Sequence, residues 1–140
     1  MPLRLVTPEL VLEPLGPQHN EPDYAAWTSS MTYIHGLPGF DGQAWPHEMS
    51  LEANLADLEE HARDFEDRSG FTYTVLDPDD GDVIGCAYIY PARDSPENDA
   101  SVRSWVRADR AQFDEPLWRA VRDWIWQEWP FENVAYAPRA

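Results

Sequence analysis

Apolar and other residues alternate along 3–15, and this period of two predicts a strand with one buried face. Pro8 interrupts the alternation and predicts a bend, because proline cannot donate to a sheet ladder. Residues 20–31 predict a short helix with Asn20 as its N-cap. Residues 32–49 are rich in glycine, proline and aromatic residues without a period, so they predict a long loop.

The apolar residues after Ser50 recur at helical spacing and predict a second helix, which Ser50 caps. Gly70 follows the last turn, as is typical of a helix end. The opposite, acidic face is predicted to lie in solvent. The residues predicted on the buried face are Leu51, Leu55, Leu58, Ala62 and Phe65.

Two β-rich runs follow at 71–76 and 83–90, and the Pro-Asp-Asp-Gly stretch between them predicts an antiparallel hairpin. A strand with a period of two comes next, at 101–108. An amphipathic helix and a last short strand at 133–139 complete the pattern, which predicts one sheet with helices packed on it. The stripe of that helix holds Leu117, Val121, Trp124, Ile125 and Glu128, with Trp126 opposite.

Length and charge restrict the class of protein. With 140 residues, of which 43% are hydrophobic, the chain predicts a single domain over 1–140 with a substantial core. It carries 26 acidic residues against 10 basic ones, all of them arginine, and a net charge of -16. Such a surface repels nucleic acids and anionic membranes, so we expect neither as a partner.

Cysteine content and apolar runs bear on the compartment. Cys86 is the single cysteine, which excludes an internal disulfide and a cysteine-cluster metal site. No apolar run approaches the ~18 residues of a membrane span, and the N-terminus lacks a signal-peptide pattern. We therefore expect a cytoplasmic location.

Three stretches, in this order, carry a resemblance to a known family. "TPELVLEPL" precedes a short helix, "DGDVIGCAYIY" leads from an acidic-Gly turn into a strand, and "SWVRADR" runs toward the helix of "LWRAVRDW". Together they resemble the GNAT superfamily of acyl-CoA N-acyltransferases, in the branch that includes the ribosomal-protein acetyltransferases. The resemblance implies an α/β (α+β) fold with a mixed, largely antiparallel sheet flanked by helices, truncated after the fifth strand.

The resemblance also implies acetyl-CoA, or another acyl-CoA, as cofactor, and a small amine or a protein N-terminus as acceptor. In the family, the fourth strand pairs with the pantetheine arm, and a Gln/Arg-x-x-Gly-x-Gly/Ala loop cradles the pyrophosphate. Aligned on Arg110, this chain has Phe113 and Glu115 at the two small positions. Val106 stands where the family's backbone donor to the oxyanion lies. The implied cofactor-binding residues are Trp105, Val106, Arg107, Arg110, Gln112, Phe113, Asp114 and Arg119.

The same junction has a second interpretation, in which its residues serve only the helix. Asp114 suits the N-cap position and Pro116 the first turn. Phe113 and Trp118 have the spacing of a hydrophobic staple. The acidic residues would then cap the helix instead of facing a ligand.

The charge along 101–126 favours an anion site, because this segment holds five arginines against four carboxylates while the rest of the chain is strongly acidic. Guanidinium groups bind phosphate through two parallel hydrogen bonds. Arg119 and Arg122 could equally pair with carboxylates along the helix. The candidate phosphate-binding residues are Arg107, Arg110, Arg119 and Arg122, and the competing carboxylates are Glu115 and Asp123.

Acyl transfer to an amine requires a base, a donor to the developing oxyanion and an acid for the leaving thiolate. Glu97 and Asp99, just before the strand at 101–108, are candidate bases, although a charged turn can also be merely solvated. Tyr136, like Tyr90, is a candidate side chain near the cleft, although strand tyrosines commonly belong to the core with a satisfied hydroxyl.

The loop at 32–49 falls where the family's substrate-binding loop lies. Its candidate residues are Tyr33, His35, Trp45 and His47. The two histidines, twelve residues apart, match no compact ligand motif, so we predict no metal site.

Trp126 is predicted on the outer face of its helix, where it could contact a protein partner or a second copy of the chain. Two functions are therefore open: an acetyl-CoA-dependent N-acetyltransferase, or a non-catalytic GNAT-like module that engages a protein partner or dimerises. A homodimer is compatible with both.

Overall fold

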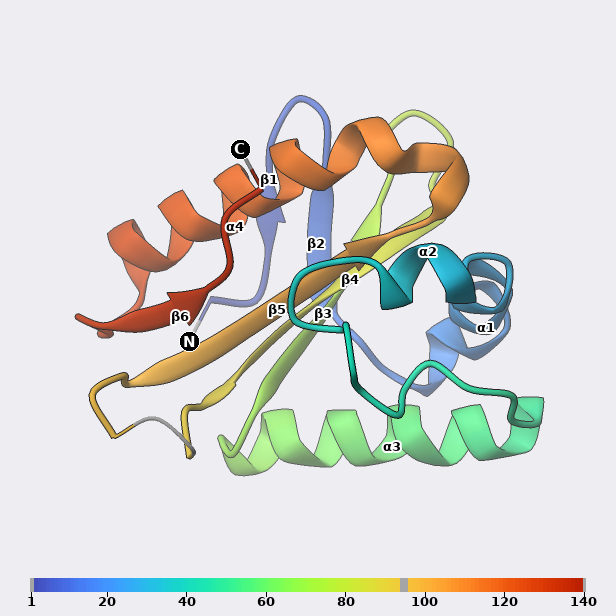
Figure 1. Cartoon of the computed structure of the whole chain (residues 1–140), viewed down its shortest axis with the longest axis horizontal. Coiled ribbons are helices and arrows are strands. Elements are labelled where there is room, and N and C mark those ends of the chain that lie inside the picture. Colours follow the sequence, from blue (N-terminus) through green and yellow to red (C-terminus); the bar gives the residue numbers. More distant parts are fainter. Residues whose placement is uncertain (1, 94–95, 140) are drawn as a thin grey trace.

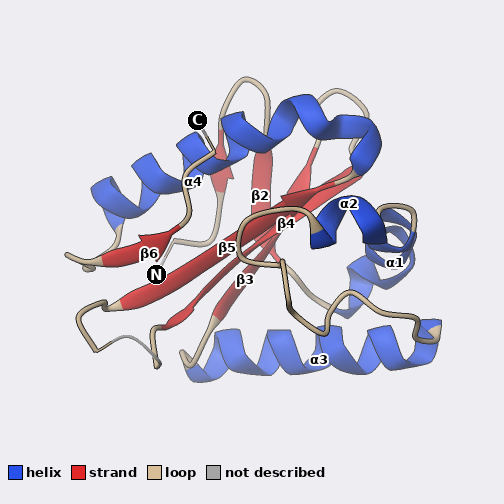
Figure 2. Ribbon diagram, in the orientation of Figure 1, coloured by secondary structure: helices blue, strands red, loops and turns tan. Residues whose placement is uncertain are grey.

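The computed structural model describes residues 2–93 and 96–139. Six strands form one sheet in the order β1-β2-β3-β4-β5-β6, antiparallel throughout except for the parallel pair β5–β6 (Figures 1 and 2). The strands are β1 Leu5–Val6, β2 Val11–Pro14, β3 Phe71–Leu76, β4 Val83–Pro91, β5 Ala100–Val106 and β6 Val134–Tyr136. The α-helices are α1 Asn20–Thr28, α2 Met31–His35, α3 Leu51–Asp67 and α4 Asp114–Glu128, and the 3-10 helices are η1 Pro17–His19 and η2 Ala108–Phe113.

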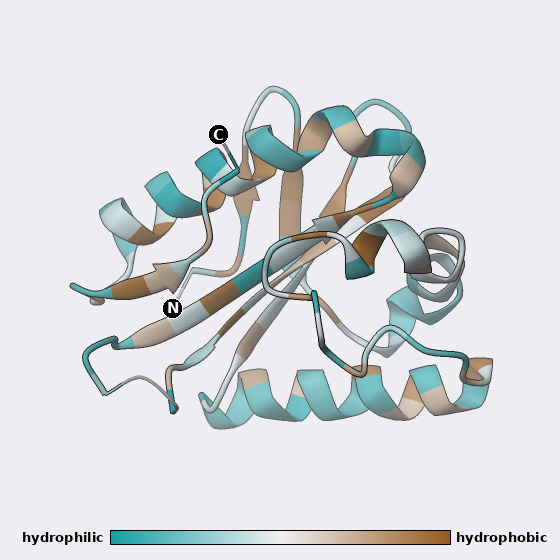
Figure 3. Cartoon of the chain, in the orientation of Figure 1, coloured by the Kyte–Doolittle hydropathy of each residue, from teal (hydrophilic) through white to brown (hydrophobic). Residues whose placement is uncertain are grey.

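The helices cover both faces of the sheet, with α4 on one side and α1 to α3 on the other (Figure 2). Successive residues of β5 alternate between the two cores, because strand side chains point to opposite faces in turn. Val102 and Val106 pack with Val121 of α4, whereas Trp105 packs with Trp27 of α1. The apolar positions gather on the strands, and the outer surfaces of α3 and α4 are largely hydrophilic (Figure 3).

The first predicted strand is a hairpin and not one bent strand, so the sheet has six strands instead of five. The chain reverses between β1 and β2. The Thr7 backbone N–H donates to Leu10 O at 2.9 Å, and the Thr7 hydroxyl accepts from the Leu10 N–H at 3.0 Å. These bonds close the turn that contains Pro8. Strands of two and four residues are too short to show in the sequence as two separate strands.

The N-terminal helix prediction was wrong about its cap. His19 is the N-cap of α1, and Asn20 uses its side chain to reach α3, where its Nδ2 donates to Leu51 O at 3.2 Å. The predicted loop at 32–49 also begins inside a short helix, α2. These elements turn back toward the sheet and place the loop over β4 and β5.

The Ser50 cap of α3 is confirmed, because its Oγ accepts from the Ala53 N–H at 3.1 Å. The buried face differs from the prediction, since Leu51 and Leu55 are exposed and Asn54 is buried beside Leu58. The hydrophobic pattern did not predict Asn54, because a polar residue buried between two helices does not belong to an apolar stripe.

The hairpin β3–β4 and the strand β5 are confirmed, and so is most of the α4 stripe. Trp126 is 80% exposed, as predicted, whereas Glu128 lies in solvent and not on the buried stripe. No helix in the described part of the chain is long and apolar enough to cross a membrane.

Candidate functional site

The sheet opens where β5 and β6 part. The two strands pair from Ala100↔Val134 to Val102↔Tyr136, after which β6 ends and β5 continues to Val106. A cavity of about 830 Å³ lies beside the paired part of the two strands, and its lining does not include Ser104 or Val106. Its lining includes Gly39, Tyr88, Ser101, Arg103, Tyr136 and Ala137.

Beyond Val102 the edge of β5 has no strand partner in the described part of the chain, and its residues Ser104 and Val106 are buried there. The Arg107 N–H donates to Ile84 O at 2.8 Å, so Arg107 and Trp105 bond toward β4. In an antiparallel ladder the intervening residues direct their backbone groups to the other edge. Ser104 C=O and Val106 N–H therefore point away from β4, toward the side where β6 has ended.

Tyr136 stands at the parting of the strands. Its hydroxyl lies 2.5 Å from Ser104 Oγ, and the residue lines the cavity. Burial raises the pKa of Tyr136 above its ordinary value, so the phenol keeps its proton at neutral pH. The site therefore holds a protonated hydroxyl next to the opening.

Arg139 crosses the opening and ties its sides together. Its side chain is 4% exposed and donates to Asp114 Oδ2 and to Ser104 O, each at 2.9 Å. Burial raises the pKa of Asp114, against the opposing effect of Arg139. Asp114 does not cap α4 as the second interpretation predicted, because Phe113 occupies the N-cap position without a side-chain cap bond.

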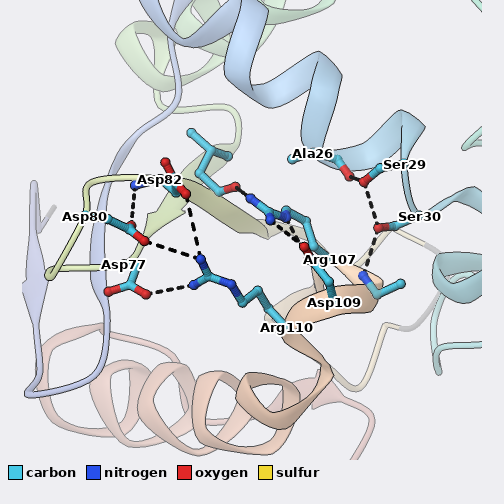
Figure 4. Close-up of polar contacts among 11 residues, drawn as sticks. Ala26, Ser29, Ser30, Asp77, Asp80, Asp82, Arg107, Asp109 and Arg110 are labelled. Atoms are coloured by element: carbon cyan, nitrogen blue, oxygen red, sulfur yellow. Dashed lines mark hydrogen bonds and ion pairs between the residues drawn. The ribbon is translucent and has the colours of Figure 1, made fainter.

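The β5–α4 junction is a 3-10 turn, η2, held by hydrogen bonds to two other segments (Figure 4). The Ala108 N–H donates to Ser30 Oγ at 2.8 Å, between α1 and α2. Arg107 makes a two-bond contact with Asp109, at 2.9 and 2.7 Å, and its Nη1 donates to Val83 O at 3.2 Å. The hydrogen bonds from Arg107 lower the pKa of Asp109.

Arg110 extends from η2 to the turn between β3 and β4 (Figure 4). Its guanidinium lies 2.7 Å from the Asp77 carboxylate, 3.4 Å from Asp80 and 3.7 Å from Asp82. Two of the four guanidinium groups predicted to meet phosphate, those of Arg107 and Arg110, are thus held by carboxylates of this chain. The sequence did not reveal these partners, because the turn lies about thirty positions before Arg110.

The two arginines of α4 pair along the helix, which confirms the competing interpretation of them. Arg119 bonds Glu115 one turn earlier. Arg122 bonds Asp123 at 3.0 Å, and its guanidinium carbon lies 4.6 Å from the centre of the Trp118 ring. These contacts direct both side chains along the α4 surface.

The remaining predicted cofactor residues divide between core and surface. Trp105 is fully buried on the α1 to α3 side, where its Nε1 donates to Tyr88 Oη at 2.9 Å. Its side chain therefore faces away from η2, although the sequence placed Trp105 among the cofactor-binding residues of that junction. Gln112 is exposed, and Phe113 is half-buried against the α4 core.

The two candidate bases lie in the segment before β5. Asp99 Oδ2 accepts from the backbone N–H groups of Glu132 and Asn133, at 2.9 and 3.1 Å. These bonds lower the pKa of Asp99, which makes it a weaker base. Glu97 is exposed in the same segment.

The predicted substrate loop folds back over the sheet. Tyr33 is half-buried beside both cores, and burial raises its pKa. His35 Nε2 donates to Pro46 O at 2.6 Å, whereas His47 is exposed beside Glu48 O. Trp45 contacts the rings of Trp27, Phe40, Tyr88 and Trp105. Across residues 2–93 and 96–139, no group of three or more potential ligands is arranged to hold a metal ion.

A second cavity, of about 350 Å³, lies between α1, α3 and the loop, and the sequence did not predict it. It adjoins the first, because Tyr88, Tyr90 and Arg103 line both. We call it the acidic pocket, after four of its lining residues, Asp23, Asp57, Glu60 and Asp64.

His61 also lines the acidic pocket and belongs to a polar network with β3 and β4. The Tyr90 hydroxyl donates to Asp64 Oδ2 at 3.0 Å, and His61 Nδ1 lies 2.9 Å from both Tyr90 Oη and Thr72 Oγ1. Burial lowers the pKa of His61 despite the nearby carboxylates, so its imidazole is neutral at neutral pH. The one signal that could have found His61 is its spacing from the buried residues Asn54 and Leu58, which places it on the same face of α3.

Comparisons with known proteins bear on the fold. No protein-family model matches the sequence, and no curated protein matches it. A solved structure from Vibrio cholerae, assigned as a ribosomal-protein-serine acetyltransferase, has a TM-score of 0.73 at 13% identity, over 94% of this chain and 71% of that one. The ribosomal-protein-S5-alanine acetyltransferase from Vibrio fischeri has a TM-score of 0.67 at 13% identity, over 90% and 68% of the two chains.

A third similar structure is the microcin C7 self-immunity acetyltransferase, in complex with acetyl-CoA and AMP. Its TM-score is 0.68 at 14% identity, over 91% of this chain and 67% of that one. The class defined by these likenesses is the GNAT acetyltransferase fold, as the resemblance implied. The mixed sheet, its parallel last pair and its flanking helices are those of this fold.

Proposed function

We propose that the chain is an acyl-CoA-dependent N-acyltransferase that acts on a primary amine, either a small amine or a protein N-terminus. The observation that carries the proposal is the parting of β5 and β6, beyond which the Val106 N–H points away from β4. The shared fold supports it, because a similar acetyltransferase structure holds acetyl-CoA.

The residues of the opening suit the arm of the acyl donor better than its phosphates. A strand edge can pair with an extended amide-bearing arm, which would here replace Arg139 as the partner of Ser104 O. At the phosphate end, Arg107 and Arg110 have suitable donors, and both are already bonded to carboxylates. The Arg107 and Arg110 side chains are only 20% and 19% exposed, so a pyrophosphate binds them by displacing Asp109 and Asp77 from these contacts.

We assign three roles around the reacting atoms. When bound, the acyl-CoA supplies a thioester whose carbon forms the new bond to the amine nitrogen as its bond to sulfur breaks. Val106 N–H stabilises the negative charge that develops on the carbonyl oxygen. His61 accepts the amine proton, and Tyr136 donates its proton to the departing sulfur.

We prefer His61 to Glu97 and Asp99 as the base, because its imidazole is neutral and because it lines a cavity near the proposed site. We assign the proton of neutral His61 to Nδ1, which lies 2.9 Å from both Tyr90 Oη and Thr72 Oγ1, and this tautomer leaves Nε2 as a proton acceptor. His61 also lines a cavity that adjoins the opening.

Calorimetric titration with acetyl-CoA tests the proposal. We expect binding, and Arg110→Ala should weaken it about tenfold, as the loss of one charge-assisted phosphate contact implies. Arg63→Ala removes an exposed arginine on α3 and serves as the matched control. The absence of binding at millimolar acetyl-CoA would overturn the proposal, and equal effects of the two substitutions would overturn the phosphate assignment.

We also propose that the chain forms a homodimer through the outer face of α4. Trp126 is 80% exposed and borders a cavity of about 340 Å³ with Trp118 and Phe131. Sedimentation should give the mass of two chains, and Trp126→Glu should return it to one. A mass of one chain for the unmodified protein at high concentration would contradict the dimer.

A further inference from the structure

The acidic pocket contains a buried carboxylate without an ionic partner. Asp23 of α1 is 4% exposed. Its Oδ2 accepts one hydrogen bond, from Asn54 Nδ2 at 3.2 Å, and its Oδ1 accepts none within the described part of the chain. A buried carboxylate of this kind is costly unless a cation or a further donor reaches it. Asp23 Oδ1 is not among the fully buried unpaired atoms of the described residues, so it is open to the pocket, where a ligand can donate to it.

Asn54 fixes Asp23 in place through a network between α1 and α3. Its Nδ2 also donates to Asn20 Oδ1 at 2.8 Å, and its Oδ1 accepts from Trp27 Nε1 at 3.0 Å. All its hydrogen-bonding groups that face this interface are used, so Asn54 has one fixed orientation. The position of Asp23 is thus set before any ligand arrives.

Aromatic rings form the wall opposite the carboxylates. Phe40, Trp45 and Tyr88 pack with ring centres 5.9 to 6.4 Å apart. Arg103 makes cation–π contacts with two of these rings: its guanidinium carbon lies 5.2 Å from the Phe40 ring centre and 5.8 Å from that of Tyr88. Ring faces attract cations, so the wall suits a positively charged ligand.

The charges that face the pocket favour the same ligand. Four carboxylates line it, and Arg103 is its one cationic side chain in the described residues, since the lowered pKa of His61 leaves that imidazole neutral. The pocket stays negative even when one carboxylate is protonated. An anionic ligand is repelled there, and a protonated amine is attracted.

We propose that the acidic pocket binds the protonated, non-reacting amino group of a linear diamine or polyamine, whose other amine reaches the opening between β5 and β6. The choice of a molecule with two amines rests on the proposed function, and on the continuity of the two cavities through Tyr88, Tyr90 and Arg103. The pocket thereby selects an acceptor by a charge that is not acylated. A monoamine lacks the group that Asp23 receives.

Titration without any acyl donor tests this binding separately from catalysis. At pH 7.5 we expect 1,4-diaminobutane to bind at least tenfold more tightly than n-butylamine, measured by calorimetry and tryptophan fluorescence. Asp23→Asn and Asp57→Asn should each weaken diamine binding about tenfold. Glu59→Gln, on the exposed face of the same helix α3 as Asp57, should leave it unchanged.

The outcomes separate the two proposals. Equal affinity for the diamine and the monoamine, or equal effects of Asp57→Asn and Glu59→Gln, would overturn the pocket assignment. Diamine binding with this variant pattern, but without acetyl-CoA binding, would uphold the pocket and overturn the acyltransferase. Acetyl-CoA binding and monoamine acylation without a preference for the diamine would uphold the acyltransferase and overturn the pocket.

Discussion

Replacing Asp23 by asparagine should stabilise the protein at neutral pH. Burial raises the pKa of Asp23 from 3.8 to about 6, with a smaller raising effect of Asp57 and opposing effects of the Asn54 hydrogen bond and of His19. The folded state therefore holds this proton to a higher pH than the unfolded state. The stability cost is absent below pH 4, grows as the pH rises from 4 to 6, and is complete at pH 7 and above.

The size of the effect follows from the shift. About two pKa units correspond to ~3 kcal/mol of unfolding free energy at pH 7.5, because each unit is worth ~1.4 kcal/mol. Asparagine keeps an oxygen that can accept from Asn54, so the gain should be roughly 1–3 kcal/mol at pH 7.5 and near zero at pH 4.

Urea denaturation of the two proteins at pH 4, 5, 6 and 7.5, followed by tryptophan fluorescence, measures this difference. Glu59→Gln, an exposed neutralisation of the same charge, controls for the overall acidity of the chain. A difference between Asp23→Asn and the unmodified protein that does not change with pH would refute the reasoning. So would destabilisation by Asp23→Asn at pH 7.5.

Three further predictions follow from the contacts described above. Asn54→Ala should lower the unfolding free energy by ~2–4 kcal/mol in urea titrations, because it leaves the buried Trp27 N–H without its acceptor; a loss below 0.5 kcal/mol would contradict a stabilising role of the Asn54 network between α1 and α3. Tyr136→Phe should lower kcat of acyl transfer about 10- to 100-fold with little change in KM, and unchanged kcat would remove Tyr136 as the acid. Asp77→Asn should tighten CoA binding in calorimetry several-fold, because Arg110 loses a competing partner; weaker binding would show that Asp77 positions Arg110.

Local periodicity predicted much of the sheet. The hairpin β3–β4, the alternation of β5 and the stripe of α4 each repeat over enough residues to give a clear period. The β1–β2 hairpin was missed because its strands are two and four residues long and a side-chain bond of Thr7 closes the turn.

Local periodicity predicted less of the candidate site than of the sheet. The position of Val106 on β5 followed from strand order and resemblance, and its role as donor stays a prediction. The acidic pocket could not be predicted in this way, because Asp23 and Asn54 meet across 31 positions of sequence and on separate helices. For the same reason Arg110 was expected to be free for phosphate, while its carboxylate partner lies 33 positions away.

Mass spectrometry of a single reaction tests the central claim most directly. The chain is incubated at pH 7.5 with acetyl-CoA and 1,4-diaminobutane, and both the acetylated amine and the released thiol are quantified. The account predicts mono-N-acetylated diamine and free CoA in equal amounts, at a rate that His61→Ala and Tyr136→Phe each reduce. Absence of acetylated amine above the enzyme-free rate, with the folded protein and millimolar concentrations of both substrates, would contradict it.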